Sequence, residues 1–138
     1  MVEFHNITLK TNGYTDIIDI TDKVENIIKN SSLKNGIVNI FCPGSTGGIT
    51  TIEYEPNLVK DIKEELENLF PYHKDYYHHL TWNDDNGSSH IRSALIKTSF
   101  TVPFKEKRLI LGTWQQIIFL DFDTRGRNRE LVITIIGE

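Results

Sequence analysis

The segment from Ser99 to the C-terminus constrains the fold more than any other part of the chain, because nearly all of it favours β-strands. Its runs are rich in β-branched and aromatic residues and are divided by short polar breaks. The runs are "SFTVPF", "RLILG", "TWQQIIFLDFD" and "ELVITIIG", and the breaks are "KEK" and "TRGRNR". We expect this part of the chain to form an antiparallel meander.

The N-terminal segment also alternates between apolar and polar residues from Val2 to Leu9, as a half-buried strand does. The pair Asn12-Gly13 favours a tight turn, because both residues tolerate a positive φ. This pattern predicts a hairpin between the first strand and "GYTDIIDI".

Two segments have helical spacing. Asp22 and Glu25 stand at the spacing of a capping box, and a short helix follows, with Asn35-Gly36 as its stop. The second helix is predicted over Asn57 to Phe70 and ends at Pro71. Its apolar stripe consists of Val59, Ile62, Leu66 and Leu69.

Two further strands are predicted between these helices, at "GIVNIFC" and at "ITTIEYE", because both are short, β-rich and bounded by Gly or Pro. Two helices on a mainly antiparallel sheet place the chain in the α+β class. At 138 residues the chain fits one domain, 1–138, with a single core.

The composition argues against several classes of partner. The formal net charge of -4 disfavours nucleic acid and an anionic membrane surface, since both require clustered Lys and Arg. A membrane span requires about 18 consecutive apolar residues, and no stretch of this chain approaches that length. The first residues lack the pattern of a signal peptide. One cysteine, Cys42, cannot form an internal disulfide and is expected to be buried and inert. We therefore expect a cytoplasmic protein.

Residues 42–48, "CPGSTGG", have a composition that a simple turn does not require. Their three glycines and two hydroxyl residues allow close backbone approach and offer N–H donors, which suits a phosphate or a carboxylate. The segment lacks the lysine and the following helix of a P-loop. A flexible connection between two strands is the alternative interpretation.

The polar stretch after Pro71 gathers groups that bind divalent metals. A loop containing glycine can bring His79 and His90 toward one point, although no H-x-x-x-H or C-x-x-C pattern fixes the geometry. A solvated loop would collect the same residue types. The set comprises His73, His78, His79, Asp84, Asp85, Asn86 and His90.

The run "LGTWQQIIF" places Gly112 inside an apolar strand, which suggests either a bulge or a close backbone approach. Gln115 and Gln116 must face opposite sides of such a strand, so one of them points inward. Arg125, Arg127 and Arg129 are expected to form a solvated basic turn.

The order of these motifs resembles the YjbQ-like family, often called secondary thiamine-phosphate synthase. The likeness runs from about Ile37 to the C-terminus, and "LGTWQ" after S-x-T-V-P is specific to that family. The residues that carry it are "PGSTGGITTIE", Tyr77-x-His79, "DDNGSSHIRSAL", "SFTVPF" and "RLILGTWQQIIFLDFD". The resemblance implies a mostly antiparallel β sandwich with two helices and a homotrimer with clefts near the subunit boundaries.

The resemblance also implies an activity and a site. The activity joins a hydroxymethylpyrimidine pyrophosphate to a thiazole phosphate, as a weak or side reaction. The implied metal ligands are His79 and His90, with Zn²⁺ or Mg²⁺ as the cofactor. The residues expected to act in catalysis are His90, Asp84, Asp85 and Glu53, and those expected to bind substrate are Gly44, Ser45, Thr46, Gly47, Arg92, Asn86 and Gln115.

The chain departs from the family pattern at Gly44, Asn83 and Ser88, where many or some members carry histidine. A site with three histidines is therefore not expected, although two histidines and a carboxylate remain open. Two alternatives to an enzyme follow: a non-catalytic trimer that binds an anion or a small molecule, and a purely structural interaction domain.

Overall fold

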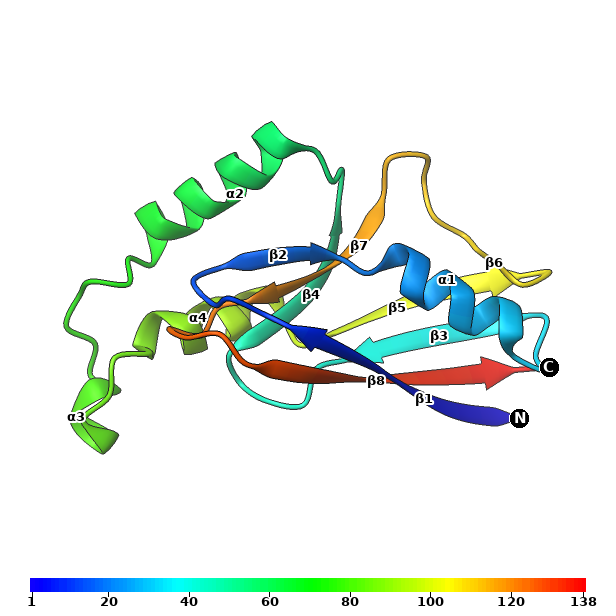
Figure 1. Cartoon of the computed structure of the whole chain (residues 1–138), viewed down its shortest axis with the longest axis horizontal. Helices are drawn as coiled ribbons and strands as arrows, with labels where there is room; N and C mark the ends of the chain where they lie inside the picture. The colour runs from blue at the N-terminus through cyan, green and yellow to red at the C-terminus, as the bar shows by residue number, and fades with distance from the viewer.

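Two antiparallel sheets form the protein, whose computed structural model describes residues 1–138 (Figure 1). One sheet has five strands in the order β1-β8-β3-β5-β6, and the other has three in the order β2-β7-β4. With four helices, this is the expected α+β fold. The elements are β1 (Val2–Lys10), β2 (Asp16–Asp19), α1 (Thr21–Asn30), β3 (Gly36–Phe41), β4 (Gly47–Ile52), α2 (Pro56–Leu69), α3 (His79–Trp82), α4 (Gly87–Ile96), β5 (Ser99–Lys105), β6 (Arg108–Leu109), β7 (Gln116–Asp121) and β8 (Asn128–Gly137).

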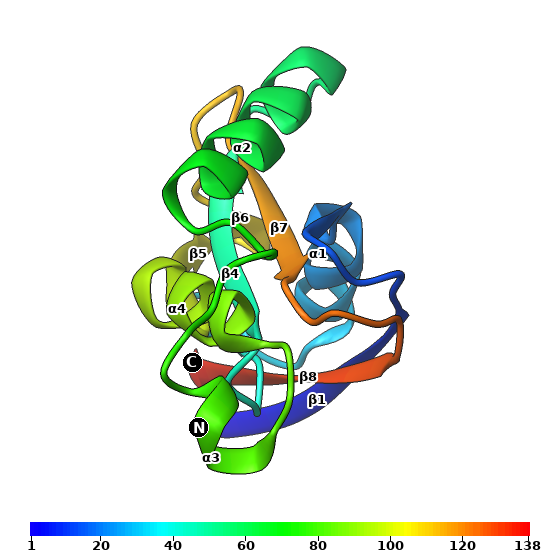
Figure 2. The ribbon, with the colours of Figure 1, turned by 90° about the vertical axis from the view of Figure 1, so that its left-hand side faces the viewer.

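The main core lies between the two sheets and α1. It joins residues such as Ile133 of β8, Phe119 of β7 and Val24 of α1, all fully buried. Each side chain of this kind stabilises the fold by about 1.5–3 kcal/mol when it leaves water. A smaller cluster covers the opposite face of the three-stranded sheet, where α2 and α4 pack. Figure 2 shows α2 and α4 on one side of β4 and β7, and α1 on the other.

The predicted N-terminal hairpin is wrong, although its first strand is confirmed. β1 pairs along its whole length with β8, whereas β2 pairs with β7 in the other sheet. Gly13, Tyr14 and Thr15 all have positive φ, so the chain turns out of the first sheet instead of folding back on it.

The first helix is confirmed, but its predicted capping box does not form. Asp22 lies inside the first turn of α1, and the carboxylate of Asp19 accepts hydrogen bonds from the backbone N–H and the hydroxyl of Thr21 at 2.9 and 2.7 Å. The second predicted helix is confirmed as α2. Its N-cap is Glu55, whose side chain accepts the backbone N–H groups of Asn57 and Leu58.

Two helices were not predicted, the single turn α3 and the longer α4. The face that α4 buries consists of Gly87, Ser88, Ser89, Arg92 and Ser93, so the helix has no apolar stripe to identify it. Its packing is polar, with Ser93 Oγ donating to the carbonyl of Gly47 at 2.6 Å and Ser89 Oγ donating to the carbonyl of Phe122.

The C-terminal strands are present, but the expected meander is wrong. Only β5 and β6 form a hairpin; β7 crosses to the three-stranded sheet, and β8 returns to lie between β1 and β3. The pattern of hydrophobic residues identifies a strand but not its neighbour, since every strand here offers a similar apolar row.

No helix combines the length and the apolar character needed to span a bilayer. The connection from β3 to β4, the start of α4 and the connection from β7 to β8 meet at one end of the molecule (Figure 1). This end brings together several of the residues singled out in the sequence.

Candidate functional site

A cleft of about 300 Å³ opens where the loop after β3 meets α4. Gly44 and Ser45 form one wall and His90 forms part of the other, so the glycine-rich segment and the second histidine do converge as expected. Gly44 has φ +135°, a conformation that side chains larger than hydrogen rarely adopt. The cleft is lined by Gly44, Ser45, His90, Ser93, Ala94, Lys97 and Thr98.

The residue whose ring contacts His90 is His78, which the sequence placed among the candidate groups but not among the two predicted metal ligands. The two imidazole rings meet edge to face with their centroids 4.5 Å apart, and His78 Nε2 lies 4.0 Å from a carboxylate oxygen of Asp84. His78 Nε2 is buried and has no hydrogen-bond partner. Adjacent histidines in "YYHHL" indicated that one of them belongs to a site, but their spacing did not indicate which.

The surroundings of His90 lower its pKa below the ordinary histidine value. Burial is the main cause and the nearby His78 adds to it, while Asp84, the backbone of Ser45 and Asp123 oppose it. Since the ordinary pKa is about 6.5, His90 is mainly neutral at pH 7. A neutral imidazole both donates and accepts a hydrogen bond.

His79 lies in a different environment. Its Nε2 accepts the backbone N–H of Gly87 at 2.9 Å, and its ring packs edge-on against Tyr76. Together with Asp85 it lines a separate shallow cleft of about 370 Å³. The structure therefore does not bring His79 and His90 to a common point.

The residues expected to bind a metal do not form a suitable set. Nowhere do three His, Cys, Asp or Glu side chains gather as metal ligands, and the ring nitrogen Nε2 of His79 is already occupied as an acceptor. Zn²⁺ in proteins requires at least three such ligands. The residues present therefore do not fit a Zn²⁺ centre.

The acidic segment divides between two roles. Asp84 lies beside His78, and the side-chain amide of Asn86 lies 3.2 Å from both carboxylate oxygens of Asp84, to which it donates when its nitrogen is turned toward them. Asp85 accepts a hydrogen bond from Thr124 Oγ1 at 3.0 Å. Of the two acids, Asp84 is therefore the one that faces the pair of histidines.

Arg92 is not available to a substrate. It is 1% exposed and bonds Ser88 Oγ, Thr15 Oγ1, the carboxylate of Glu67 and the carbonyl of Phe70, at 2.6–2.9 Å. Its guanidinium also stacks 4.0 Å from the ring centroid of Tyr72. Arg92 therefore ties α4 to the end of α2 and to the loop before β2.

Glu53 and Gln115 lie at the far end of β4 from the glycine-rich loop. Gln115 accepts the N–H of Gly112 at 2.8 Å and donates to Thr51 at 3.3 Å, and Glu53 directly follows the strand. β4 has six residues, so its ends are about 17 Å apart. These two residues do not contribute to the His90 cleft.

Thr46, the last residue of the loop, and Gly47, the first residue of β4, are both buried. A Cβ on Gly47 would come within 2.9 Å of Cys42 Sγ and of the Phe119 ring, so this glycine permits close packing. Thr46 Oγ1 accepts a hydrogen bond from Arg129 Nη2 at 2.7 Å. Burial raises the pKa of the Cys42 thiol, and the prediction of a buried cysteine is confirmed.

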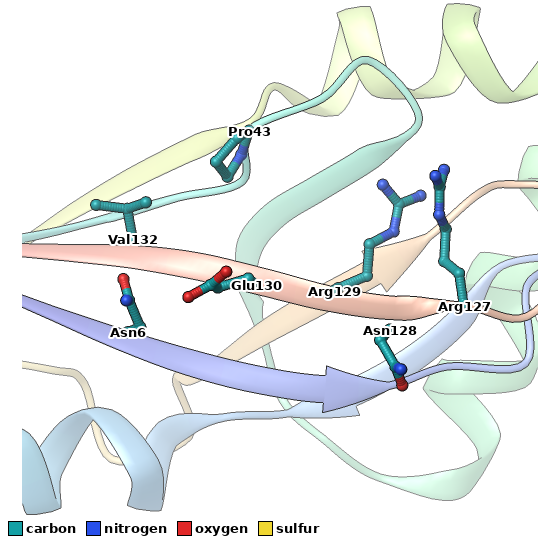
Figure 3. Close-up of a pocket in the computed structure, with 7 residues that line it drawn as sticks. All are labelled: Asn6, Pro43, Arg127, Asn128, Arg129, Glu130 and Val132. Atoms are coloured by element: carbon teal, nitrogen blue, oxygen red, sulfur yellow. The ribbon is translucent and has the colours of Figure 1, made fainter.

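The prediction of a solvated basic turn is wrong for Arg129. It is only 6% exposed and pairs with the fully buried Asp121, at 2.9 and 3.1 Å. It also borders a second cleft, of about 390 Å³, whose lining residues are drawn in Figure 3. This cleft is lined by Asn6, Pro43, Arg127, Asn128, Arg129, Glu130 and Val132.

Comparisons with known proteins agree with this architecture. The model of the family described as UPF0047 protein YjbQ-like matches residues 5–138. A UPF0047 protein of Archaeoglobus fulgidus is 39% identical over 126 residues, covering 91% of this chain and 96% of that protein. The UPF0047 protein YugU of Bacillus subtilis is 33% identical over 132 residues, covering 95% of this chain and 97% of that protein.

Solved structures give the same result. A YbjQ-like protein of unknown function from Sulfolobus solfataricus superposes with a TM-score of 0.94 at 33% identity, covering 100% of this chain and 99% of that one. A YjbQ/UPF0047 family protein from Clostridium acetobutylicum gives a TM-score of 0.87 at 34% identity, with 96% and 99% coverage. The chain belongs to the YjbQ-like UPF0047 family.

Proposed function

We propose that the protein binds a phosphate-bearing small molecule in the cleft between the glycine-rich loop and α4. The observation that carries this proposal is that Gly44, Ser45, His90 and Lys97 line one cleft. The loop supplies backbone N–H groups and the Ser45 hydroxyl, and Lys97 supplies a positive charge. Hydrogen-bond donors and a positive charge of this kind are the groups that bind phosphate oxygens most favourably.

The geometry of α4 supports this assignment. The helix ends at Ile96, and Lys97 follows with φ +78°, an uncommon conformation for a residue with a side chain. The backbone N–H of Lys97 bonds the Ser93 carbonyl, and its own carbonyl accepts the N–H of Ile49 in β4. The backbone of Lys97 is thereby held in place at the cleft.

A transferase reaction is the second proposed function, on the basis of the family resemblance. In that reaction a ring nitrogen of the thiazole bonds to the methylene carbon of the pyrimidine. The bond from this carbon to the pyrophosphate oxygen breaks, and the pyrophosphate leaves with the electron pair. This displacement needs no protein nucleophile, which suits a chain whose single thiol is buried and has a raised pKa. Lys97 and the loop N–H groups would stabilise the departing charge.

Calorimetric titration with pyrophosphate tests the binding proposal. Lys97→Gln and His90→Gln are expected to weaken the affinity about fivefold or more, since each removes a polar partner of the anion. Lys60→Gln, on the exposed face of α2, is the matched control and should leave it unchanged. Failure of millimolar pyrophosphate to bind, or equal affinities for Lys97→Gln and Lys60→Gln, would contradict the proposal.

The proposed transferase reaction is tested by measuring the release of pyrophosphate. Pyrophosphate release from the hydroxymethylpyrimidine pyrophosphate is expected only when the thiazole phosphate is also present, and it should fall in Lys97→Gln. If both substrates bind but release does not exceed that of a protein-free control, the non-catalytic alternative holds.

Self-association as a homotrimer is also proposed, through the outer face of the five-stranded sheet. This face carries exposed apolar side chains on adjacent strands, and large exposed apolar patches usually mark interaction sites. The exposed apolar side chains on this face are Val2, Phe4, Ile37, Phe41 and Ile136. A cytoplasmic location belongs to the same proposal, since Cys42 is a free thiol.

A further inference from the structure

The Arg129 guanidinium is held from one side only. Its Nε and Nη2 donate to the two carboxylate oxygens of Asp121, and Nη2 also donates to Thr46 Oγ1. Nη1 donates to no group in the protein, and it is not among the buried polar atoms that lack a partner. One edge of a nearly buried guanidinium is therefore fixed in direction and still free to bind.

The free edge faces a place where the protein leaves room. A Cβ added to Gly44 would lie 3.5 Å from Arg129 Nη1, so the glycine keeps this approach open. In Figure 3 the guanidinium groups of Arg127 and Arg129 lie side by side and point the same way from β8. Arg127 bonds Asp123 at 2.7 Å through Nη1, which leaves its other nitrogens available.

The backbone of β8 is also unpaired beside this cleft. Pairing with β3 stops at Val132, whereas pairing with β1 continues to Asn128. Thr11 donates its N–H to the Arg127 carbonyl on the β1 side. Because hydrogen-bonding directions alternate along an antiparallel strand, Asn128 and Glu130 turn their backbone N–H groups toward the open side.

We propose that the Arg129 cleft is a second anion subsite that takes a phosphate group, with Arg129 Nη1, Arg127 and the β8 backbone as donors. Its donors do not line the His90 cleft, although Gly44, which lies beside Arg129 Nη1, does. The loop after β3 contributes Pro43 to the Arg129 cleft and Gly44 and Ser45 to the His90 cleft. Combined with the proposed function, this arrangement accommodates two phosphate-bearing groups beside one loop. Glu130 also lines the Arg129 cleft and opposes anion binding.

The test is a titration of the folded protein with inorganic phosphate, followed through backbone amide signals in two-dimensional NMR spectra. The signals of residues 128–130 report on the Arg129 cleft, and those of Ser45 and His90 report on the other. As followed by the signals of residues 128–130, Arg127→Gln is expected to weaken the affinity for phosphate about fivefold or more. Glu130→Gln is expected to strengthen that affinity about threefold. Arg125→Gln, on the same turn but outside the cleft, should change neither set by more than about twofold.

The two proposals fail separately. If phosphate shifts the signals of Ser45 and His90 but not those of residues 128–130, the second subsite is wrong and the proposed function stands. The reverse pattern leaves the subsite standing and overturns the His90 assignment. Equal effects of Arg127→Gln and Arg125→Gln at residues 128–130 would also overturn the subsite, because its binding would then reflect general surface charge.

Discussion

Arg129 is the only charged side chain on the row of β8 that faces the core, where Leu131, Ile133 and Ile135 are its buried neighbours. It reaches across to Asp121, the last residue of β7, so this ion pair links the two sheets. Burial raises the pKa of Asp121, but hydrogen bonds from Arg129 and Thr11 outweigh it and hold the pKa below its usual value. The pair keeps a guanidinium in a fixed orientation at the edge of the core.

Asp121→Asn should lower the free energy of unfolding by about 3 kcal/mol, because it leaves Arg129 as an unpaired charge that is almost fully buried. Urea denaturation at pH 7 measures this difference. Glu130→Gln, an exposed neighbour, is the control and should change stability by less than about 0.5 kcal/mol. Similar values for the two variants would show that the pair does not stabilise the fold.

His90 makes anion binding depend on pH. Its lowered pKa means that it gains its proton below about pH 6.5, so affinity for sulfate, which stays doubly charged, should rise as the pH falls from 7 to 5. The same shift means that the stability associated with neutral His90 is present above pH 6.5 and is lost as the pH falls. His78 and Asp84 are the titratable side chains beside the His90 ring.

Calorimetry with sulfate at several pH values measures this effect. His90→Gln is expected to flatten the dependence, and His73→Gln, outside the cleft, should preserve it. An unchanged slope in His90→Gln would assign the titration to another group.

At the scale of elements, α4 depends on polar packing instead of an apolar stripe. Its inward face carries serines and Arg92, and these side chains bond backbone carbonyls of neighbouring segments. Because each of these contacts is directional, they set the position of the helix and therefore the position of the half-buried His90. Lys97, which directly follows the helix and has φ +78°, belongs to the same arrangement.

Arg92→Lys tests this role. Lysine keeps the charge but not the planar set of donors, so we expect a loss of about 2 kcal/mol in unfolding free energy. Pyrophosphate affinity, measured by calorimetry well below the unfolding temperature, should stay within about twofold of the parent. A large loss of affinity without a loss of stability would instead restore Arg92 as a ligand of the substrate.

At the scale of the whole molecule, the two sheets have different surroundings. Residues 117–122 of β7 and the turn after it are buried on both faces, by the main core and by α2 and α4. The outer face of the five-stranded sheet, by contrast, remains open and partly apolar. The apolar residues on both faces of β7 are therefore explained within the chain, whereas those on the outer face of β8 are the ones that favour self-association.

The assembly prediction is checked by sedimentation velocity at micromolar protein. The parent protein should sediment as a trimer, and the double variant Phe4→Lys and Ile37→Lys should sediment as a monomer, since it places charges on the outer face. Leu69→Lys, at an exposed apolar position on α2, is the control and should remain a trimer. A monomeric parent would contradict the proposal.

The sequence by itself determined which segments are strands and which two are helices with apolar stripes, because period-two and helical spacing are local properties of the chain. It also determined the family, and it indicated that the glycine-rich loop and His90 belong together. It did not determine that His78 and not His79 meets His90, nor that Arg92 and Arg129 are buried.

Only the tertiary structure decided those points, because strand neighbours and charged contacts depend on residues far apart in the chain. Arg129 and Asp121 are close in sequence but lie on strands of different sheets, and Arg92 bonds Thr15 from a distant loop. A charged residue next to a turn has the same local pattern whether it faces water or a buried carboxylate. Its partner appears only when the two sheets pack together.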